Sequence, residues 1–186
     1  MDSGQFQRFG LAAAPTAAAV ANYCDHVEHN EPAETGWVVD AGNELSRLAL
    51  EFAHAAGVDL LELYAERLGA IEAGNTLARP DGPDGRAAAL AAATWRELQL
   101  AQLEHDRYYH PDVFGLARTE QLRHYAFHLA KIVGAFAEPA DPDDLISRRL
   151  PDVLLFAIKL QTVMGRRLAD EPLPGRSGVD QPTRRA

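Results

Sequence analysis

Histidine and aspartate gather at one point of the chain, in the segment EHDRYYHPD at residues 104–112. Imidazole and carboxylate groups bind transition metals and transfer protons. His105, Asp106 and His110 are therefore candidate ligand-binding residues, since a helix end holds side chains rigidly while leaving access. Together with His128 they could form a metal centre for hydrolytic or oxidative chemistry. The alternative is structural, with Asp106 closing the turn and the tyrosines covering the edge of the core.

A second group of polar residues follows in the next predicted helix. His124 and His128 are four residues apart, and Lys131 comes three residues later. On a helix these three positions share one face. Two histidines at this spacing can hold a metal ion, whereas the lysine suits a phosphate or carboxylate ligand. We interpret the three residues as a candidate ligand site, with interhelical hydrogen bonding or a solvated face as the alternative.

A third group is mainly acidic and lies in the first part of the chain. Asp25 and His29 belong to one predicted helix, and Asp40 and Glu44 belong to the next. Carboxylates one turn apart on facing helices are a common way for helical bundles to bind metal ions. These four residues are a candidate site for magnesium, manganese or a transition metal. An ordinary charged helix face is the alternative.

The elements that must position these side chains are helices. Apolar residues recur at three- and four-residue spacing, and no segment shows the two-residue alternation of a strand. Segments rich in glycine and proline separate the helical patterns. We therefore predict an all-α protein, a six-helix bundle with helices at about 15–30, 38–56, 60–73, 86–108, 119–137 and 141–168.

The same patterns predict the domain organisation. Residues 1–14 lack periodicity and are expected to form a flexible N-terminus, while residues 15–170 form a single helical domain. A loop at 77–85 divides this domain into two parts, 15–76 and 86–170. Residues 171–186 are rich in proline, glycine and arginine and are expected to be a disordered tail.

Several segments resemble a known family. The sequences GVDLLE at 57–62, HLAKIVGAF at 128–136 and DVLLFAIKL at 152–160 are similar to stretches of the MazG-like, all-α nucleoside triphosphate pyrophosphohydrolases. The two parts of the domain also align with each other, so the resemblance implies two degenerate MazG-like halves in one chain. It further implies a homodimer and a nucleotide or phosphorylated metabolite as the ligand.

The sequence departs from this family at the metal-binding motif. The family binds magnesium through E-E-x-x-E on one helix and E-x-x-D on the next. Lys131, Ile132 and Ala135 stand at the first motif, and Arg149 replaces an acid of the second, which keeps only Asp152. Since magnesium requires oxygen ligands, we do not expect the usual hydrolytic activity from this half.

Composition excludes several other classes of protein. The 18 lysines and arginines against 27 acidic residues give a net charge of −9, which argues against nucleic acid and anionic membranes as partners. One cysteine cannot form an intrachain disulfide, and no apolar run is long enough for a membrane span. The motifs GxGxxG, GxxxxGK[ST], GxSxG and CxxC are all absent. A cytoplasmic, bacterial protein is expected, since the N-terminus lacks a secretory signal, alanine is abundant and 16 of the 18 basic residues are arginine.

The sequence thus predicts a divergent MazG-like helical protein that binds a nucleotide or a phosphorylated metabolite. A helical His/Asp metalloenzyme that uses residues 105–128 is one alternative. A non-catalytic adaptor protein is the other.

Overall fold

The computed structural model describes residues 2–75, 82–138 and 140–175. Regular secondary structure in these ranges is helical, apart from one isolated bridge between Thr94 and Pro172. The predicted all-α class is therefore confirmed. Among the described helices, none combines the length and the apolar character that crossing a bilayer demands.

The described residues form more helices, several of them shorter, than the predicted six-helix bundle. Its helices are α1 (Ser3–Glu28), α2 (Thr35–Ala56), α3 (Leu60–Gly74), α4 (Gly85–Ala91), α5 (Trp95–Tyr109), α6 (Pro111–Phe114), α7 (Arg118–Ala137), α8 (Pro142–Asp144) and α9 (Leu150–Val163), with a π-helical turn, η1 (Leu145–Arg149), before α9. The helix predicted over 86–108 is in fact α4 and α5. Thr94 begins α5 by accepting a hydrogen bond from the Glu97 amide, while the Glu97 carboxylate accepts one from the Thr94 amide.

The prediction of a flexible N-terminus over residues 1–14 is wrong, because α1 begins at Ser3. The Asp2 side chain caps the helix, and the rings of Phe6 and Phe9 are buried between α2 and α7. Pro15 lies inside α1 and does not end it. Burial of the two phenylalanines outweighs the hydrogen bond that this proline cannot make.

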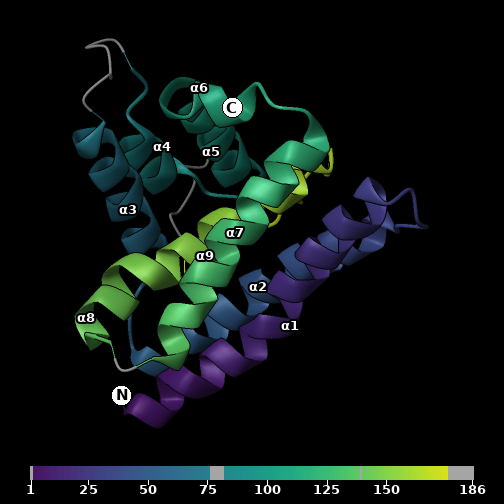
Figure 1. Cartoon of the computed structure of the whole chain (residues 1–186). Coiled ribbons are helices and arrows are strands. Elements are labelled where there is room, and N and C mark those ends of the chain that lie inside the picture. Colours follow the sequence, from purple (N-terminus) through teal and green to yellow (C-terminus); the bar gives the residue numbers. More distant parts are fainter. Residues whose placement is uncertain (1, 76–81, 139, 176–186) are drawn as a thin grey trace.

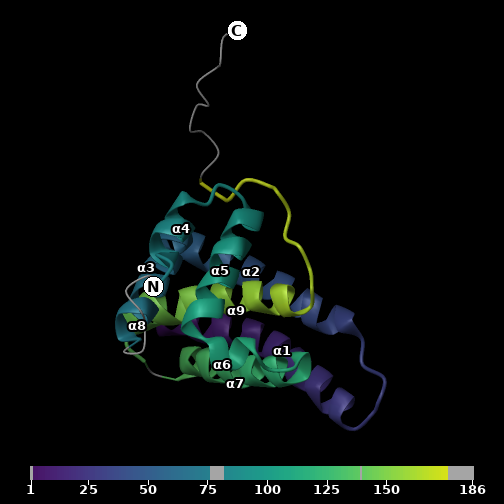
Figure 2. The same ribbon diagram turned by 90° about the horizontal axis from the view of Figure 1, so that it is seen from above.

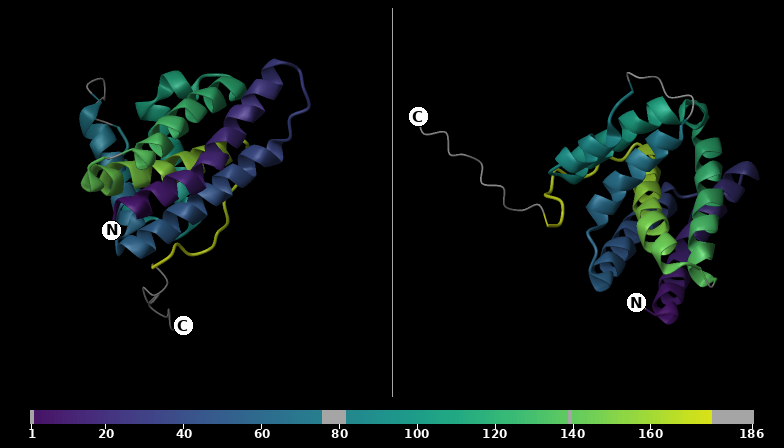
Figure 3. Two further views of the ribbon diagram at one scale, coloured as in Figure 1. Left: turned by 60° about the horizontal axis from the view of Figure 1, so that its bottom comes forward. Right: turned by 90° about the vertical axis from the view of Figure 1, so that its left-hand side faces the viewer.

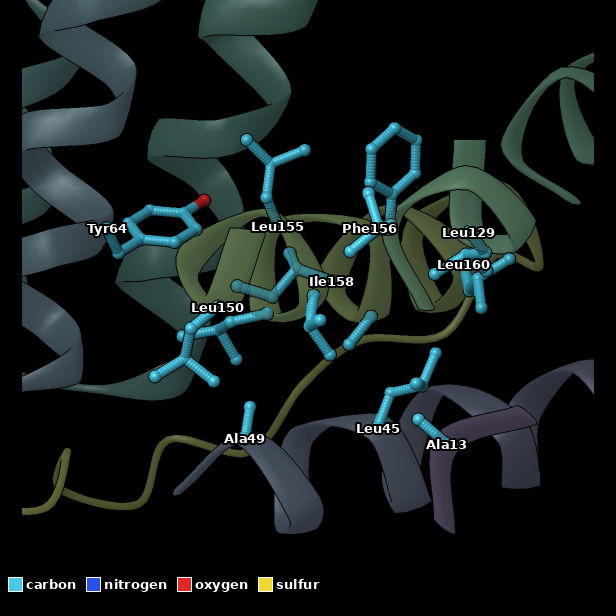
Figure 4. Close-up of a cluster of buried hydrophobic side chains, with 14 of the residues drawn as sticks. Ala13, Leu45, Ala49, Tyr64, Leu129, Leu150, Leu155, Phe156, Ile158 and Leu160 are labelled. Atoms are coloured by element: carbon cyan, nitrogen blue, oxygen red, sulfur yellow. The ribbon is translucent and has the colours of Figure 1, made fainter. Parts of the chain in front are cut away.

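Helix α9 is the central element of the bundle. Helices α2, α3, α5 and α7 all pack against it, and α1 lies against α2 and α7 (Figures 1 and 2). Residues 150–161 are buried without interruption, as expected for a helix surrounded by other helices. Figure 4 shows Leu150, Ile158 and Leu160 of α9 in one cluster with Leu45 of α2 and Leu129 of α7.

Helices α1 and α7 lie close together on one side of the molecule (Figure 3). A Cβ atom added to Gly10 would stand only 3.0 Å from Phe136 Cβ, so a larger residue at this position would require α1 and α7 to move slightly apart. Beside the contact runs a groove of about 670 Å³, lined mostly by alanine and glycine. Two large apolar side chains project along this α1–α7 groove, Leu11 with 70% and Phe127 with 71% of its surface exposed.

The segment after α9 returns to the body of the protein. Leu173 is fully buried, and its amide donates a hydrogen bond of 2.9 Å to the Ala93 carbonyl. The Trp95 amide donates in the same way to the Glu171 carbonyl. The predicted disordered tail is therefore wrong for residues 171–175, while 176–186 lie outside the described residues, as does most of the predicted loop at 77–85.

Candidate functional site

A cavity of about 280 Å³ lies beside the central helix, between α3, α5, α6, α7, η1 and α9. The sequence contains two lysines, Lys131 and Lys159, and both line this cavity. Arg67, Arg148 and Arg149 line it as well, so that five cationic side chains come from four elements. We call this space the basic cavity.

Two ion pairs, one buried and one partly buried, connect α9 to its neighbours at the wall of the basic cavity. Asp152 and Lys159 lie two turns apart on the buried α9, so they share one face. The Arg67 guanidinium of α3 donates two hydrogen bonds to the Asp152 carboxylate. One runs from Nε to Oδ1 at 2.6 Å, and the other from a terminal nitrogen to Oδ2 at 3.3 Å. Lys159 Nζ lies 2.8 Å from Oδ1 of Asp106 on α5. Each charge has a partner, as the cost of burying it requires.

The two remaining arginines are placed by the π-helical turn η1. Pro151 follows this turn, and in a continuous α-helix its ring would clash with the carbonyl of Ser147. The wider π turn ahead of Pro151 relieves this conflict, and such turns often occur at functional sites. Arg148 and Arg149 leave it toward Asp144, with nitrogen to oxygen distances of 3.7 and 3.0 Å.

The basic cavity carries an excess of positive charge. Three carboxylates, those of Asp106, Asp144 and Asp152, pair with four of the five cations. Lys131 is exposed and forms no ion pair with any described residue. Five positive charges against three negative charges leave an excess of two, in a chain whose net charge is −9. This local reversal of sign favours an anionic ligand.

The histidines predicted as a pair on one helix face both line the basic cavity. The rings of His124 and His128 have centroids 4.6 Å apart, and His128 stacks on Phe156 at 5.3 Å. Burial lowers the pKa of His128 to about 4, and the Lys131 ammonium adds to this effect. Burial and the Lys159 ammonium lower the pKa of His124 in the same direction. Both imidazoles are therefore neutral at pH 7.

The group His105, Asp106 and His110 could hold a metal ion. One ligand atom from each residue lies within 4.8 Å of the others, and this is the one such group of three or more that the described residues contain. Burial opposes the charge on Asp106, but the Lys159 ammonium holds its pKa below the usual range. Burial also lowers the pKa of His110, with Lys159 as the second cause. The group thus offers one carboxylate and two imidazoles.

The acidic candidate site is arranged differently. Asp25 is exposed on α1 and His29 is exposed at the C-terminal cap of this helix, with 3.4 Å between the carboxylate and the ring nitrogen. On α2 Asp40 is exposed, and the Glu44 carboxylate is taken up by Arg47 at 2.5 and 2.8 Å. Among the described residues these four side chains are not brought together as one group.

Sequence reasoning names neither Arg67 nor Lys159 as a site residue, and it names Asp152 only as the acid that remains of the second magnesium motif. The available signal was the segment DVLLFAIKL, in which two charged residues interrupt an otherwise apolar run. Charged residues in a helix that is apolar on every side must be paired or must serve a ligand. Arg67 gives no such signal, because only the fold brings α3 against α9.

No protein-family model, no curated protein and no solved structure matches this chain. The resemblance to the MazG-like pyrophosphohydrolases therefore stays a prediction.

Proposed function

We propose that this protein binds a small phosphorylated ligand in the basic cavity. The observation that carries the proposal is the gathering of both lysines and three arginines around one cavity of an acidic protein. Guanidinium and ammonium groups are the common partners of phosphate oxygens. Lys131 and Arg148 are the most available, since Lys131 has no ion pair among the described residues and Arg148 has a long one.

The size of the cavity narrows the class of ligand. About 280 Å³ is close to the lower limit of small-molecule sites. This volume suits a phosphorylated metabolite, or the phosphate part of a nucleotide whose remainder lies outside. Phe156 and the neutral ring of His128 offer a flat wall against the ligand's uncharged part.

Binding is favoured over pyrophosphate hydrolysis. The two carboxylates that line the basic cavity, Asp106 and Asp152, are already paired with Lys159 and Arg67. Magnesium and manganese require oxygen ligands that are free to coordinate them. In this proposal such an ion would enter the cavity on the ligand's own phosphates.

Isothermal titration calorimetry with pyrophosphate, in buffer with a chelator, tests the proposal. We expect saturable binding that weakens about tenfold in Lys131→Gln, because a hydrogen bond to a charged group contributes about 1.5 kcal/mol or more. Arg167→Gln is the matched control, since Arg167 is an exposed arginine that does not line the cavity. We expect it to bind like the wild type.

Two results would remove the proposal. One is the absence of binding for phosphate, pyrophosphate and nucleoside phosphates alike, which would favour the adaptor alternative. The other is an equal loss of affinity in Lys131→Gln and Arg167→Gln, which would indicate a general electrostatic effect and no site.

A further inference from the structure

His105 is the least satisfied polar side chain in the described structure. Its ring is fully buried, and neither Nδ1 nor Nε2 has a hydrogen-bond partner among the described residues. The nearest carboxylate oxygens belong to Glu72, 3.6 Å from Nε2, and to Asp106, 3.8 Å from Nδ1. Both distances exceed that of a hydrogen bond. A buried polar group without a partner costs about 1–3 kcal/mol, so its presence calls for an explanation.

The surroundings of this ring are those of a metal ligand. Asp106 and His110 place a carboxylate oxygen and a ring nitrogen within 4.8 Å of His105. On the other side of the ring, Glu72 is held in place by a hydrogen bond of 2.7 Å from the Gly85 amide. A carboxylate behind a coordinating histidine fixes the orientation of the ring.

We propose that His105, Asp106 and His110 bind a divalent transition metal of the zinc type. His105 would coordinate through Nδ1, on the side of Asp106, and would direct Nε2–H toward Glu72. Two imidazoles and one carboxylate are typical ligands of zinc and of similar ions, and they are poor ligands for magnesium. Asp106 and His110 also line the basic cavity, so the remaining coordination position faces that space. This inference does not depend on the phosphate-binding proposal.

Metal binding requires a small movement. In tetrahedral zinc sites the ligand atoms stand about 3.4 Å apart, so the widest pair of this group must close by up to about 1.4 Å. His110 is able to make this movement, because it lies half-buried in the break between α5 and α6.

Lys159 opposes the metal. Its ammonium lies 2.8 Å from Asp106 Oδ1, so an incoming ion must share this carboxylate with a positive charge or displace it. The wild-type affinity is therefore lower than that of a site without the lysine. Replacement of Lys159 by methionine should tighten metal binding, which an ordinary packing role for His105 would not produce.

The experiment titrates protein freed of metal with zinc by calorimetry, and with cobalt by absorption spectroscopy, in buffer without phosphate. We expect about one ion per chain and the visible absorption of tetrahedral cobalt. His110→Ala should abolish both signals, and Glu72→Gln should weaken binding about 10- to 100-fold. His105→Gln should also abolish them, but His110→Ala carries the test because His110 is only half-buried.

His124→Ala is the matched control, since His124 lines the same cavity outside the proposed group. It should bind zinc like the wild type. The inference is overturned if the wild type binds neither zinc nor cobalt. It is equally overturned if His124→Ala loses the metal while His110→Ala keeps it. Pyrophosphate binding in chelator is measured separately, so that failure of one proposal leaves the other open to its own test.

Discussion

The pair formed by Lys159 and Asp106 allows a sharp test of the charges around α9. In Lys159→Met the Asp106 carboxylate stays buried but loses its ammonium partner. Removal of one member of a buried ion pair costs about 3–5 kcal/mol. The hydrogen bond of 2.9 Å from Gln102 to Asp106 remains, so we expect the lower end of this range, about 3 kcal/mol.

The pH dependence of this loss has a definite sign. In the wild type the pKa of Asp106 is lower in the folded protein than in the unfolded chain, where it is about 3.9. The ionised carboxylate therefore stabilises the folded protein at pH values above about 3.9, and this stabilisation is lost as pH falls through the pKa of the folded protein. Without Lys159, burial raises the pKa of this carboxyl group above that of the unfolded chain. The free energy difference between wild type and variant is therefore largest at pH 6–8 and narrows as pH falls toward about 4.

Thermal unfolding and urea unfolding at pH 7 and pH 4 measure this difference. For a protein of this size, about 3 kcal/mol corresponds to a decrease in Tm of roughly 6–12 °C. Lys131→Met is the control, because Lys131 is exposed and forms no ion pair with described residues, and it should stay within about 0.5 kcal/mol of the wild type. A loss below about 1 kcal/mol in Lys159→Met, or a loss independent of pH, would refute this account of Asp106.

Three further predictions follow from other parts of the molecule. Leu173→Ala should destabilise the protein by about 2 kcal/mol or more in urea unfolding, because the side chain is fully buried, whereas a disordered segment would show no change. Sulfate, whose charge is constant between pH 5 and 8, should bind more tightly in calorimetry as pH falls, because it favours protonation of His128, whose pKa is about 4 in the free protein; an affinity that is flat with pH would contradict this. The expected homodimer should use the α1–α7 groove, so light scattering should show a dimer that Phe127→Ser disrupts and Leu100→Ser preserves; a wild type that is monomeric at high concentration would exclude it.

The sequence predicts α2 and α7 closely, but it does not predict the start of α1, the break between α4 and α5 or the assembly of the helices. The spacing of Leu45, Phe52 and Leu129 is local information, so periodicity located α2 and α7 well. The sequence analysis predicts a helix start at Pro15, although Phe6 and Phe9 already carry the helical spacing before it. Propensity rules describe the cost of a proline but not the tertiary burial that outweighs it.

The candidate site was also predicted only where its residues are close together in the sequence. The cluster of His105, Asp106 and His110 was visible because its members are neighbours in sequence. The pairing of Arg67 with Asp152 spans 85 residues and depends on the packing of α3 against α9, which no local pattern encodes. The sequence indicates these buried charges only through Asp152 and Lys159, which interrupt the apolar run of α9. They are informative because a buried charge is costly and therefore requires a partner.

Lys159 lines the basic cavity and pairs with Asp106 of the proposed metal site, so we expect binding at the two sites to be coupled. An anion in the basic cavity attracts the ammonium away from Asp106, and a metal ion on Asp106 repels it toward the cavity. Each ligand should therefore strengthen binding of the other, by the same factor in both directions, typically 5- to 150-fold. Sulfate titrations with and without zinc measure this factor, and it should be smaller in Lys159→Met, where only the direct attraction between the metal ion and the anion remains. An unchanged sulfate affinity of the wild type in the presence of zinc would show that Lys159 does not connect the two sites. If the Lys159 ammonium moves between Asp106 and the cavity, binding at one site must change the affinity of the other.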